Sequence, residues 1–146
     1  MGEVRARFRL TNAADEALVR AGQLARDQMR TYEADALIDT GAIRPVIPVH
    51  VLQQLGIGVR GRRVVEYADG RQENVDVTGP IVFEVQGRDT IEEALVLGDE
   101  VLIGQTVLEK LDLLPDCANR RLIPNPAHPD QPVSKVKSTS IPRVRS

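Results

Sequence analysis

Short runs of apolar or alternating residues, separated by breaks rich in Gly, Pro and Asp, recur along most of this chain of 146 residues. In "VRARFRL", residues 4–10, three arginines alternate with Val, Ala, Phe and Leu, which is the pattern of a strand with one buried face. Further runs lie at residues 34–38, 64–67, 75–77, 81–85 and 94–97. Strand signals this short and this frequent predict a mainly β domain.

Two stretches interrupt the strands with helical patterns. "PVHVLQQLG" (48–56) is stopped by its final glycine and "QTVLEKLDLL" (105–114) meets Pro115, so each predicts a short helix. Residues 13–27 leave helix and irregular structure both open, because their propensity favours a helix that Gly22 interrupts.

The composition fits one compact domain, since 42% of the residues are hydrophobic in a chain of this length. Residues 125–146 differ from the rest, because they set four basic residues against one aspartate, are rich in Pro and Ser, and lack an apolar period. We therefore expect a domain over residues 1–124 and a disordered basic tail over residues 125–146. A contact of this tail with RNA or an acidic partner is the alternative to a role in solubility.

Charge and hydropathy argue against two classes of partner. The formal net charge of -2, the two Tyr and two Phe, and the absence of Trp offer little for nucleic acid to bind or stack on. Neither a signal peptide nor an apolar run of about 18 residues is present, so we expect no membrane contact and a cytoplasmic location.

Metal chemistry and thiol chemistry also lack support. Cys117 is the only cysteine, which argues against an internal disulfide or a cysteine-based zinc cluster, and we expect it to be buried or half-buried. His50 and His128 show no spacing with Cys, His or Asp that would build a tetrahedral site. We therefore expect no metal and no cofactor.

The segment "ALIDTGA", residues 36–42, sets a carboxylate at the end of an apolar run. One interpretation is a surface turn, in which Asp39 accepts hydrogen bonds from nearby backbone amides and Gly41 supplies a positive φ. The other is a rigid loop that holds Asp39 where water is scarce, with the Gly41 amide and the Thr40 hydroxyl around it. If a second identical aspartate faced the first, the pair would share one proton and could act as base and acid in amide hydrolysis.

Several motifs, in this order, resemble those of the retropepsin-like aspartic proteases, dimeric relatives of retroviral proteases that also occur in bacteria. The family pattern is an apolar strand ending in Asp-Thr-Gly-Ala, a flap hairpin, two more strands, and an apolar-apolar-Gly element that opens a short helix. The corresponding segments are "ALIDTGA" (36–42), "VVEYADGRQENVDV" (64–77), "GPIVFEV" (79–85), "EALVLG" (93–98) and "VLIGQTVLEKL" (101–111). The resemblance implies an all-β, retropepsin-like acid protease barrel with a flap hairpin and a short C-terminal helix, in a homodimer.

The same resemblance implies roles for the residues of the motif. Asp39 would be the catalytic acid and base, Thr40 would brace the loops of two chains against each other, and Gly41 would let substrate backbone approach. Ala42 completes the motif and is expected beside the substrate.

Two further groups of residues take roles from the resemblance. Ile103 and Gly104 are expected to pack beneath the motif, with Gly104 small enough for close backbone contact, although a glycine before a helix also serves as an ordinary cap. Ala68, Asp69 and Gly70 form a tight-turn signal, which the resemblance implies is the tip of a flap that binds substrate. On the turn signal alone, this segment would be an exposed hairpin.

The motif occurs once, because Asp69-Gly70 lacks the Thr and Asp89-Thr90 is followed by Ile91 in place of Gly. One chain would therefore supply half a site, and an active enzyme would have to be a symmetric homodimer. The terminal segments 4–10 and 120–124 would suit the pairing across the two-fold axis that is common in the family.

Two departures from the family pattern limit what the resemblance implies. Gln105 stands where viral relatives tend to have Arg, which weakens the transfer of dimer contacts. Ile43, Arg44 and Pro45 replace the acidic or hydroxyl residues that are common after the motif, so the chemistry of the substrate pocket does not carry over.

The sequence thus predicts an aspartic endopeptidase that hydrolyses peptide bonds with water activated between two Asp39 carboxylates, without a covalent intermediate and best at mildly acidic pH. The alternative is a non-catalytic dimerisation or peptide-binding module on the same fold, because a fold does not fix a function. A third possibility is a latent enzyme that trims its own "PNPAHPDQP" junction, residues 124–132.

Overall fold

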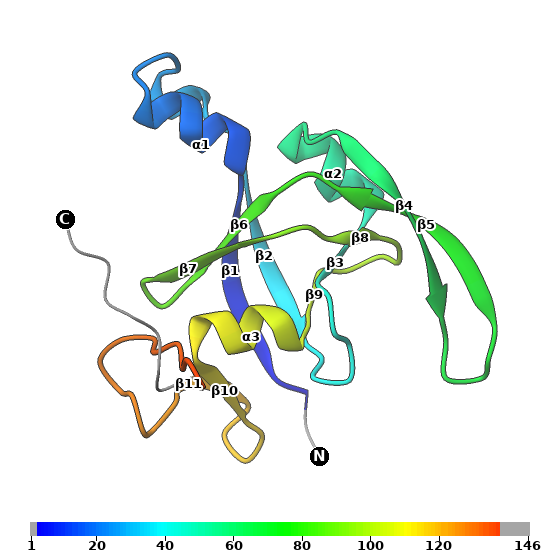
Figure 1. The fold of residues 1–146 in the computed structure, drawn as a ribbon, viewed down its shortest axis with the longest axis vertical. Helices are drawn as coiled ribbons and strands as arrows, with labels where there is room; N and C mark the ends of the chain where they lie inside the picture. Colours follow the sequence, from blue (N-terminus) through cyan, green and yellow to red (C-terminus); the bar gives the residue numbers. More distant parts are fainter. Residues whose placement is uncertain (1–2, 138–146) are drawn as a thin grey trace.

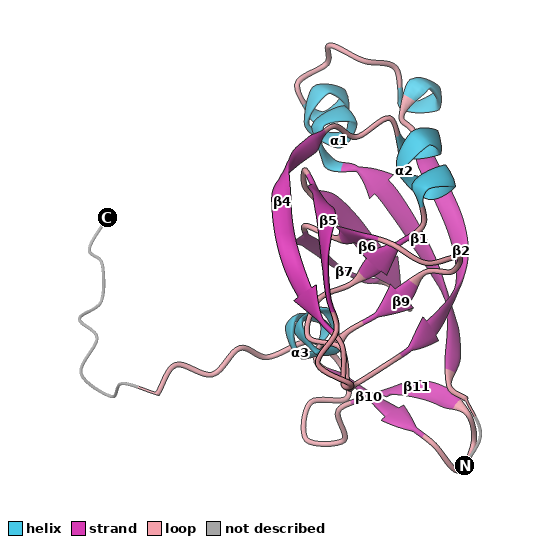
Figure 2. Ribbon diagram, turned by 90° about the vertical axis from the view of Figure 1, so that its right-hand side faces the viewer, coloured by secondary structure: helices cyan, strands magenta, loops and turns pink. Residues whose placement is uncertain are grey.

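The computed structural model describes residues 3–137 and is mainly β. Nine strands form one curled sheet with the order β4-β5-β8-β3-β9-β2-β1-β6-β7 (Figure 1). They are β1 (Arg5–Asn12), β2 (Thr31–Ile38), β3 (Val46–Ile47), β4 (Val59–Glu66), β5 (Gln72–Thr78), β6 (Ile81–Val85), β7 (Arg88–Glu92), β8 (Leu95–Val96) and β9 (Leu102–Ile103). Viewed from the side, the sheet curls around its own inner face as a half-barrel (Figure 2), which confirms the predicted all-β barrel, whereas the homodimer stays a prediction.

β1 lies inside the sheet, between β2 and β6, and shows the alternation that its sequence predicts. It pairs antiparallel with β2 along its length and with β6 in its second half. Phe8 and Leu10 are fully buried, whereas Arg7 and Arg9 are exposed, so the arginines stand on the solvent face of the strand.

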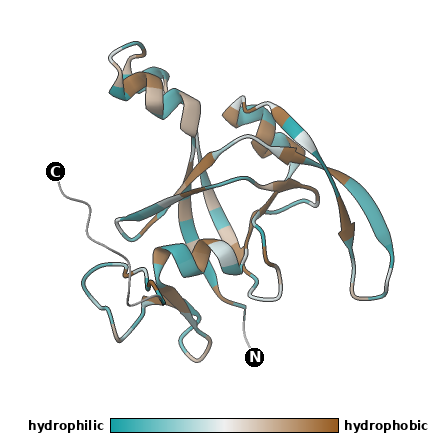
Figure 3. Cartoon of the chain, viewed as in Figure 1, coloured by the Kyte–Doolittle hydropathy of each residue, from teal (hydrophilic) through white to brown (hydrophobic). Residues whose placement is uncertain are grey.

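The apolar residues of the strands meet inside the curl of the sheet. The largest fully buried side chains are Phe8, Leu10, Ile47, Leu55, Ile81, Phe83, Ile103, Leu108, Leu111 and Leu113. They come from five strands and two helices, including Leu113 from the segment after the second of these helices, so one core joins segments far apart in the sequence. The hydropathy colouring shows apolar residues interspersed with hydrophilic ones along the strands (Figure 3).

The segment for which the sequence leaves helix open is helical in its first half. Helix α1 (Ala13–Arg20) starts after Asn12, whose side chain accepts a hydrogen bond from the Asp15 amide at 3.1 Å. The chain leaves the helix through Gly22, whose φ of 73° lies in the left-handed region. A short 3-10 helix, Arg26–Gln28, follows before β2.

Both predicted short helices are present. Helix α2 (Val49–Leu55) ends at Gly56, where the backbone is left-handed. Helix α3 (Gln105–Leu111) ends earlier than its apolar pattern predicts, because Asp112 is also left-handed and the next residues form β10 (Leu113–Asp116). β10 pairs with β11 (Arg121–Pro124) in a separate two-stranded sheet. Both terminal segments that were expected to pair across a two-fold axis thus have strand partners within the chain.

Asp112 also holds the segment that follows β11. Its carboxylate accepts hydrogen bonds from the Asn125 side chain and the Val133 amide, each at 3.0 Å, and lies 2.6 Å from Nδ1 of His128. Residues 125–133 are therefore attached to the domain although they form no helix or strand. The boundary at residue 124 stays a prediction, and residues 138–146 of the predicted tail lie outside the described residues.

Over residues 3–137, none of the helices is both long enough and apolar enough to cross a membrane.

Candidate active site

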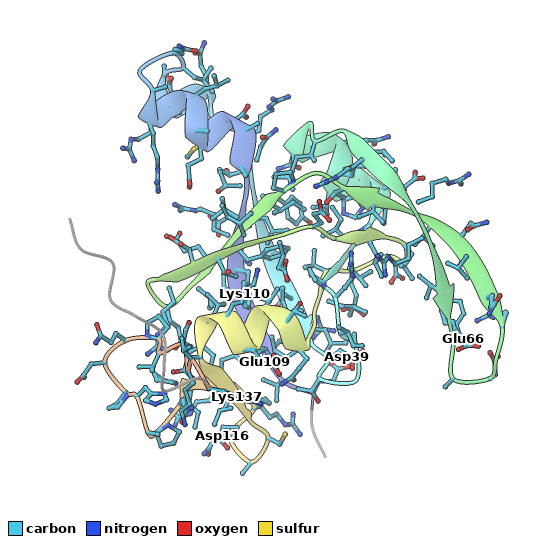
Figure 4. The ribbon with its side chains drawn as sticks, viewed as in Figure 1. Asp39, Glu66, Glu109, Lys110, Asp116 and Lys137 are labelled. Carbon is cyan, nitrogen blue, oxygen red and sulfur yellow. The ribbon has the colours of Figure 1, made fainter. Side chains whose placement is uncertain are left out.

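The loop after β2, residues 39–44, carries the Asp-Thr-Gly motif and is called the Asp39 loop below. β2 runs parallel to β9 with Ile38 beside Ile103, and the Asp39 amide donates a hydrogen bond to the Ile103 carbonyl oxygen at 2.9 Å. This strand contact continues onto Asp39, so the sheet fixes the backbone from which the carboxylate extends (Figure 4).

The carboxylate of Asp39 is oriented within its own loop. Its Oδ1 accepts a hydrogen bond from the Gly41 amide at 3.0 Å, and a Cβ on residue 41 would lie only 3.2 Å from the same oxygen. Gly41 does not have the positive φ that the surface-turn interpretation requires. A side chain here would fit only tightly, and the Asp39 carboxylate would have to shift by a few tenths of an ångström.

The tip of the loop faces solvent in a single chain. Asp39 is half-buried, while Thr40 and Gly41 are exposed. The expectation that water is scarce around Asp39 is therefore wrong for one chain by itself. Within residues 3–137, the Thr40 hydroxyl makes no hydrogen bond, so its predicted role as a brace has no partner inside the chain.

Gly104 lies directly against the Asp39 loop. A Cβ on residue 104 would come within 2.7 Å of the carbonyl oxygens of both Ala42 and Arg44. Any side chain would therefore push the loop away. This is the close backbone contact that the sequence analysis expects for Gly104, with Ile103 on the strand beside it.

The start of α3 holds the same loop through hydrogen bonds. The Gln105 amide donates to the Ala42 carbonyl oxygen at 2.8 Å. Both the amide and the hydroxyl of Thr106 donate to the Ile43 carbonyl oxygen, at 3.0 and 2.9 Å. The first amides of a helix have no partner within it, and here the Asp39 loop supplies their acceptors. Thr106 was not singled out from the sequence, where its signal is a hydroxyl in the first turn of the predicted helix.

A groove of about 500 Å³ lies between the Asp39 loop and β4. Its lining is mostly apolar, and the residues that line it are Asp39, Gly41, Ala42, Ile43, Arg44, Val46, Arg63, Val64, Val65, Glu66, Tyr67, Leu95 and Leu97. The structure thus brings Asp39, Gly41 and Ala42 together with one strand of the predicted flap. Sequence reasoning missed the residues of β4 in this lining, because strand alternation does not show which face meets a loop distant in the chain.

β4 and β5 form the hairpin that the sequence predicts, with residues 67–71 at its turn. The Gly70 amide donates to the Tyr67 carbonyl oxygen at 2.9 Å, and Gly70 has a φ of 85°. Ala68, Asp69 and Gly70 are exposed and none of them lines the groove, so the side of the hairpin and not its tip meets the Asp39 loop. The labelled side chains of Asp39 and Glu66 in Figure 4 mark the two sides of the groove, the Asp39 loop and β4.

The remaining candidate residues lie away from the groove. His50 packs edge-on against Tyr32, with ring centroids 6.1 Å apart, and His128 contacts Asp112. Cys117 is exposed, so the prediction that it is buried or half-buried is wrong. In the described part of the chain, no three His, Cys, Asp or Glu side chains are grouped closely enough to hold a metal ion.

The fold is similar to that of solved retroviral proteases. The EIAV protease complexed with the inhibitor HBY-793 superposes with a TM-score of 0.50 and 17% identity, covering 74% of this chain and 86% of that one. The solution structure of the simian foamy virus (mac) protease gives a TM-score of 0.43 at 17% identity, covering 71% of this chain and 90% of that one. No protein-family model matches the chain, and no curated protein sequence matches it. The likeness to the EIAV protease shows that this fold is retropepsin-like.

Proposed function

We propose that two copies of this chain form an aspartic endopeptidase whose active site is built from the Asp39 loop of each copy. The observation that carries this proposal is the position of Asp39. Its carboxylate stands on a loop held by β9 and α3, at a groove suited to a peptide, in a retropepsin-like fold. Catalytic carboxylates need such a fixed mount, because a small displacement of a reacting group costs much of the rate.

A second copy is needed to complete the site. One chain supplies a single Asp39, and the tip of its loop is open, with Thr40 and Gly41 exposed and the Ile43 side chain 72% exposed. The Ile43 side chain would lose contact with water if a second copy packed against this tip. A two-fold axis at this tip would set the two Asp39 carboxylates face to face, because an isologous interface repeats the same surface on both sides.

Two facing carboxylates would divide the chemistry between them. One stays protonated, because two negative charges in contact cannot both persist. The ionised Asp39 takes a proton from a water molecule, whose oxygen attacks the carbonyl carbon of the substrate. The protonated Asp39 gives its proton to the carbonyl oxygen. The C–N bond of the tetrahedral intermediate then breaks as the Asp39 that took the proton of water passes it to the leaving nitrogen, while the other Asp39 takes a proton from a hydroxyl of the intermediate.

The groove supports an extended peptide as the substrate. Its apolar part comes from Val46, Val65, Leu95 and Leu97, which can take substrate side chains, and β4 forms the wall opposite the Asp39 loop. A peptide between β4 and the loop would be shielded from water on two sides. We infer that the exposed hairpin tip, residues 68–70, closes over the peptide when both chains and substrate are present.

Cleavage of a mixed peptide library at pH 4 to 7 tests this function. The wild-type protein should cut, and Asp39→Asn should lose at least about 100-fold of the rate, because the amide cannot exchange the proton. Asn keeps an oxygen that can accept the Gly41 amide, so the fold should persist. Asp89→Asn is the matched control, since Asp89 is an exposed residue of β7 that is also followed by Thr.

Two results would reject the proposal. Equal cleavage by wild type and Asp39→Asn would show that Asp39 takes no part in the reaction. Peptide binding without cleavage by either protein would favour the non-catalytic peptide-binding module instead.

A further inference from the structure

The groove contains two arginines that have no acidic partner. Arg44 and Arg63 line it, and over residues 3–137 neither guanidinium forms an ion pair or a side-chain hydrogen bond. Many arginines elsewhere are paired: Arg5 with Glu3 and Glu100, Arg9 with Glu33, Arg30 with Asp15, Arg60 with Glu93, and Arg62 with Asp76. Some arginines elsewhere, such as Arg7 and Arg26, also lack an acidic partner, but Arg44 and Arg63 are the two that line this mostly apolar groove within residues 3–137.

The register of the hairpin places Arg63 on its inner face. Arg63 lies opposite Val75, which is 5% exposed, and residues directly opposite each other share a face of the sheet. The neighbouring Arg62 lies opposite Asp76 and pairs with it on the other face. Arg63 is exposed at the edge of the curl, on the same face as Val75, and its side chain lines the groove.

The acidic residues around the groove do not cancel these charges. Glu66 also lines the groove, but within residues 3–137 its carboxylate forms no ion pair with Arg44 or Arg63. Glu73, opposite Val65, shares the inner face, and its carboxylate accepts a hydrogen bond from the Tyr67 hydroxyl at 2.6 Å. Asp39 is the other acidic residue in the groove lining, and its Oδ1 accepts a hydrogen bond from the Gly41 amide.

Arg44 is held in place by its backbone. Its carbonyl oxygen packs against the α carbon of Gly104, and the preceding carbonyl oxygen, of Ile43, accepts two hydrogen bonds from Thr106. Its side chain is half-buried at the groove. A charged group on a fixed backbone loses less freedom on binding than one on a mobile loop.

We propose that this groove selects peptides that carry a glutamate or aspartate within a few residues of the scissile bond, bound by Arg44 and Arg63. The proposal rests on the proposed peptidase function and names the substrate class of the same site. An extended peptide sends alternate side chains to opposite sides, so an apolar side chain can lie on Val46, Leu95 and Leu97 while a neighbouring carboxylate reaches the guanidinium groups. Guanidinium and carboxylate groups form paired, charge-assisted hydrogen bonds, which are stronger than neutral ones.

Paired peptides that differ only in Glu or Gln, at each position within four residues of the cleaved bond, test the substrate class. At one or more positions, kcat/KM of wild type should be on the order of tenfold higher for Glu, the range of one charge-assisted hydrogen bond. Arg63→Gln and Arg44→Gln should each reduce this ratio, and the double variant should bring it near one. Arg62→Gln on the outer face is the matched control and should keep the wild-type ratio.

Binding to the Asp39→Asn protein separates this inference from the catalytic proposal. Fluorescence anisotropy with labelled Glu and Gln peptides reports selectivity without cleavage. Cleavage with equal kcat/KM for the Glu and Gln peptides at every position would overturn the proposed acidic preference. The proposed peptidase function would still hold. If no peptide is cleaved but Glu peptides are still bound more tightly through Arg44 and Arg63, the peptidase proposal would be rejected. The preference for acidic peptides would then be supported. A preference that survives in the double variant would also overturn the assignment.

Discussion

The α carbon of Gly104 lies so close to the Asp39 loop that a Cβ there would meet the carbonyl oxygen of Ala42 at 2.7 Å. The same Cβ would also meet the Arg44 carbonyl oxygen at 2.7 Å, so the backbone of the Asp39 loop would have to move at two residues. Gly104 thus lies where the loop that carries the Asp39 carboxylate packs against the start of the helix that supports it.

Gly104→Ala should therefore lower stability and activity together. We expect a loss of about 1–3 kcal/mol in the free energy of unfolding, the usual cost of overpacking, because the clash is with backbone and not with a flexible side chain. Urea unfolding and peptide cleavage measure the two effects. Gly58→Ala is the matched control, since no atom lies within 4 Å of its added Cβ, and it should be neutral or slightly stabilising. A Gly104→Ala protein as stable as wild type would contradict this prediction, because it would show that the Asp39 loop moves aside at no cost in stability.

The Asp15 carboxylate links α1 to the start of β2 and should be a main source of stability at that end of the domain. It is 4% exposed and accepts three hydrogen bonds from Arg30, at 2.9 Å from the backbone amide and 2.8 and 2.9 Å from the guanidinium. Asp15→Ala should cost about 2–3 kcal/mol, because it leaves these donors without an acceptor. Glu16→Ala, which removes only a pair on one helix with Arg20, should cost about 0.5 kcal/mol or less. Equal losses in the two variants would contradict the role of Asp15.

The attachment of residues 125–133 to Asp112 should depend on pH. The pKa of Asp112 is lowered from its ordinary value of 3.8 by hydrogen bonds from the Asn125 side chain and the Val133 amide, and by His128. A carboxyl group whose pKa is lower in the folded state stabilises the fold above its unfolded pKa, and this contribution is lost as the pH falls through the folded pKa. Wild type should therefore be more stable than Asp112→Asn at pH 7, and the difference should shrink below about pH 4.

Denaturant unfolding from pH 2.5 to 7 measures this dependence. Asp116→Asn is a useful comparison, because the pKa of Asp116 is lowered by Asn119 and Arg121 and not by the segment after β11. Limited proteolysis should also cut within residues 125–133 faster in Asp112→Asn. A stability difference that stays constant over the whole pH range would exclude the Asp112 carboxylate as its source.

The sequence predicts the parts of this fold whose signals are local. Alternation in residues 4–10 predicts β1, and the Asp-Thr-Gly-Ala motif predicts a fixed carboxylate because its geometry depends on three consecutive residues. β3, β8 and β9 contain two residues each, too few for a period, and gain their pairing only from distant strands. The hydrogen bonds that Asp112 accepts also span long sequence separations, which is why residues 125–133 read as a solvated tail.

The same distinction applies to the candidate site. Gly104 could be singled out because an apolar-apolar-Gly element before a helix is visible in the sequence. Arg63 could not, because the inner face of the hairpin is set by its register with β5 and by the curl of the sheet. Thr106 contributes through two hydrogen bonds to the Ile43 carbonyl oxygen, a partner that only the folded chain brings near.

Mixing wild type with Asp39→Asn should reveal that two chains share one active site. If each site needs an Asp39 from both copies, an equal mixture that exchanges subunits leaves about one quarter of the dimers with two intact aspartates. The rate per total protein should then fall to about a quarter, whereas sites complete within one chain would leave about half. Peptide cleavage after equilibration, at a total concentration where wild type is fully dimeric by sedimentation, distinguishes these values. Asp89→Asn in place of Asp39→Asn should leave the rate unchanged, because that residue lies on β7 away from the groove and its dimers keep both Asp39 carboxylates.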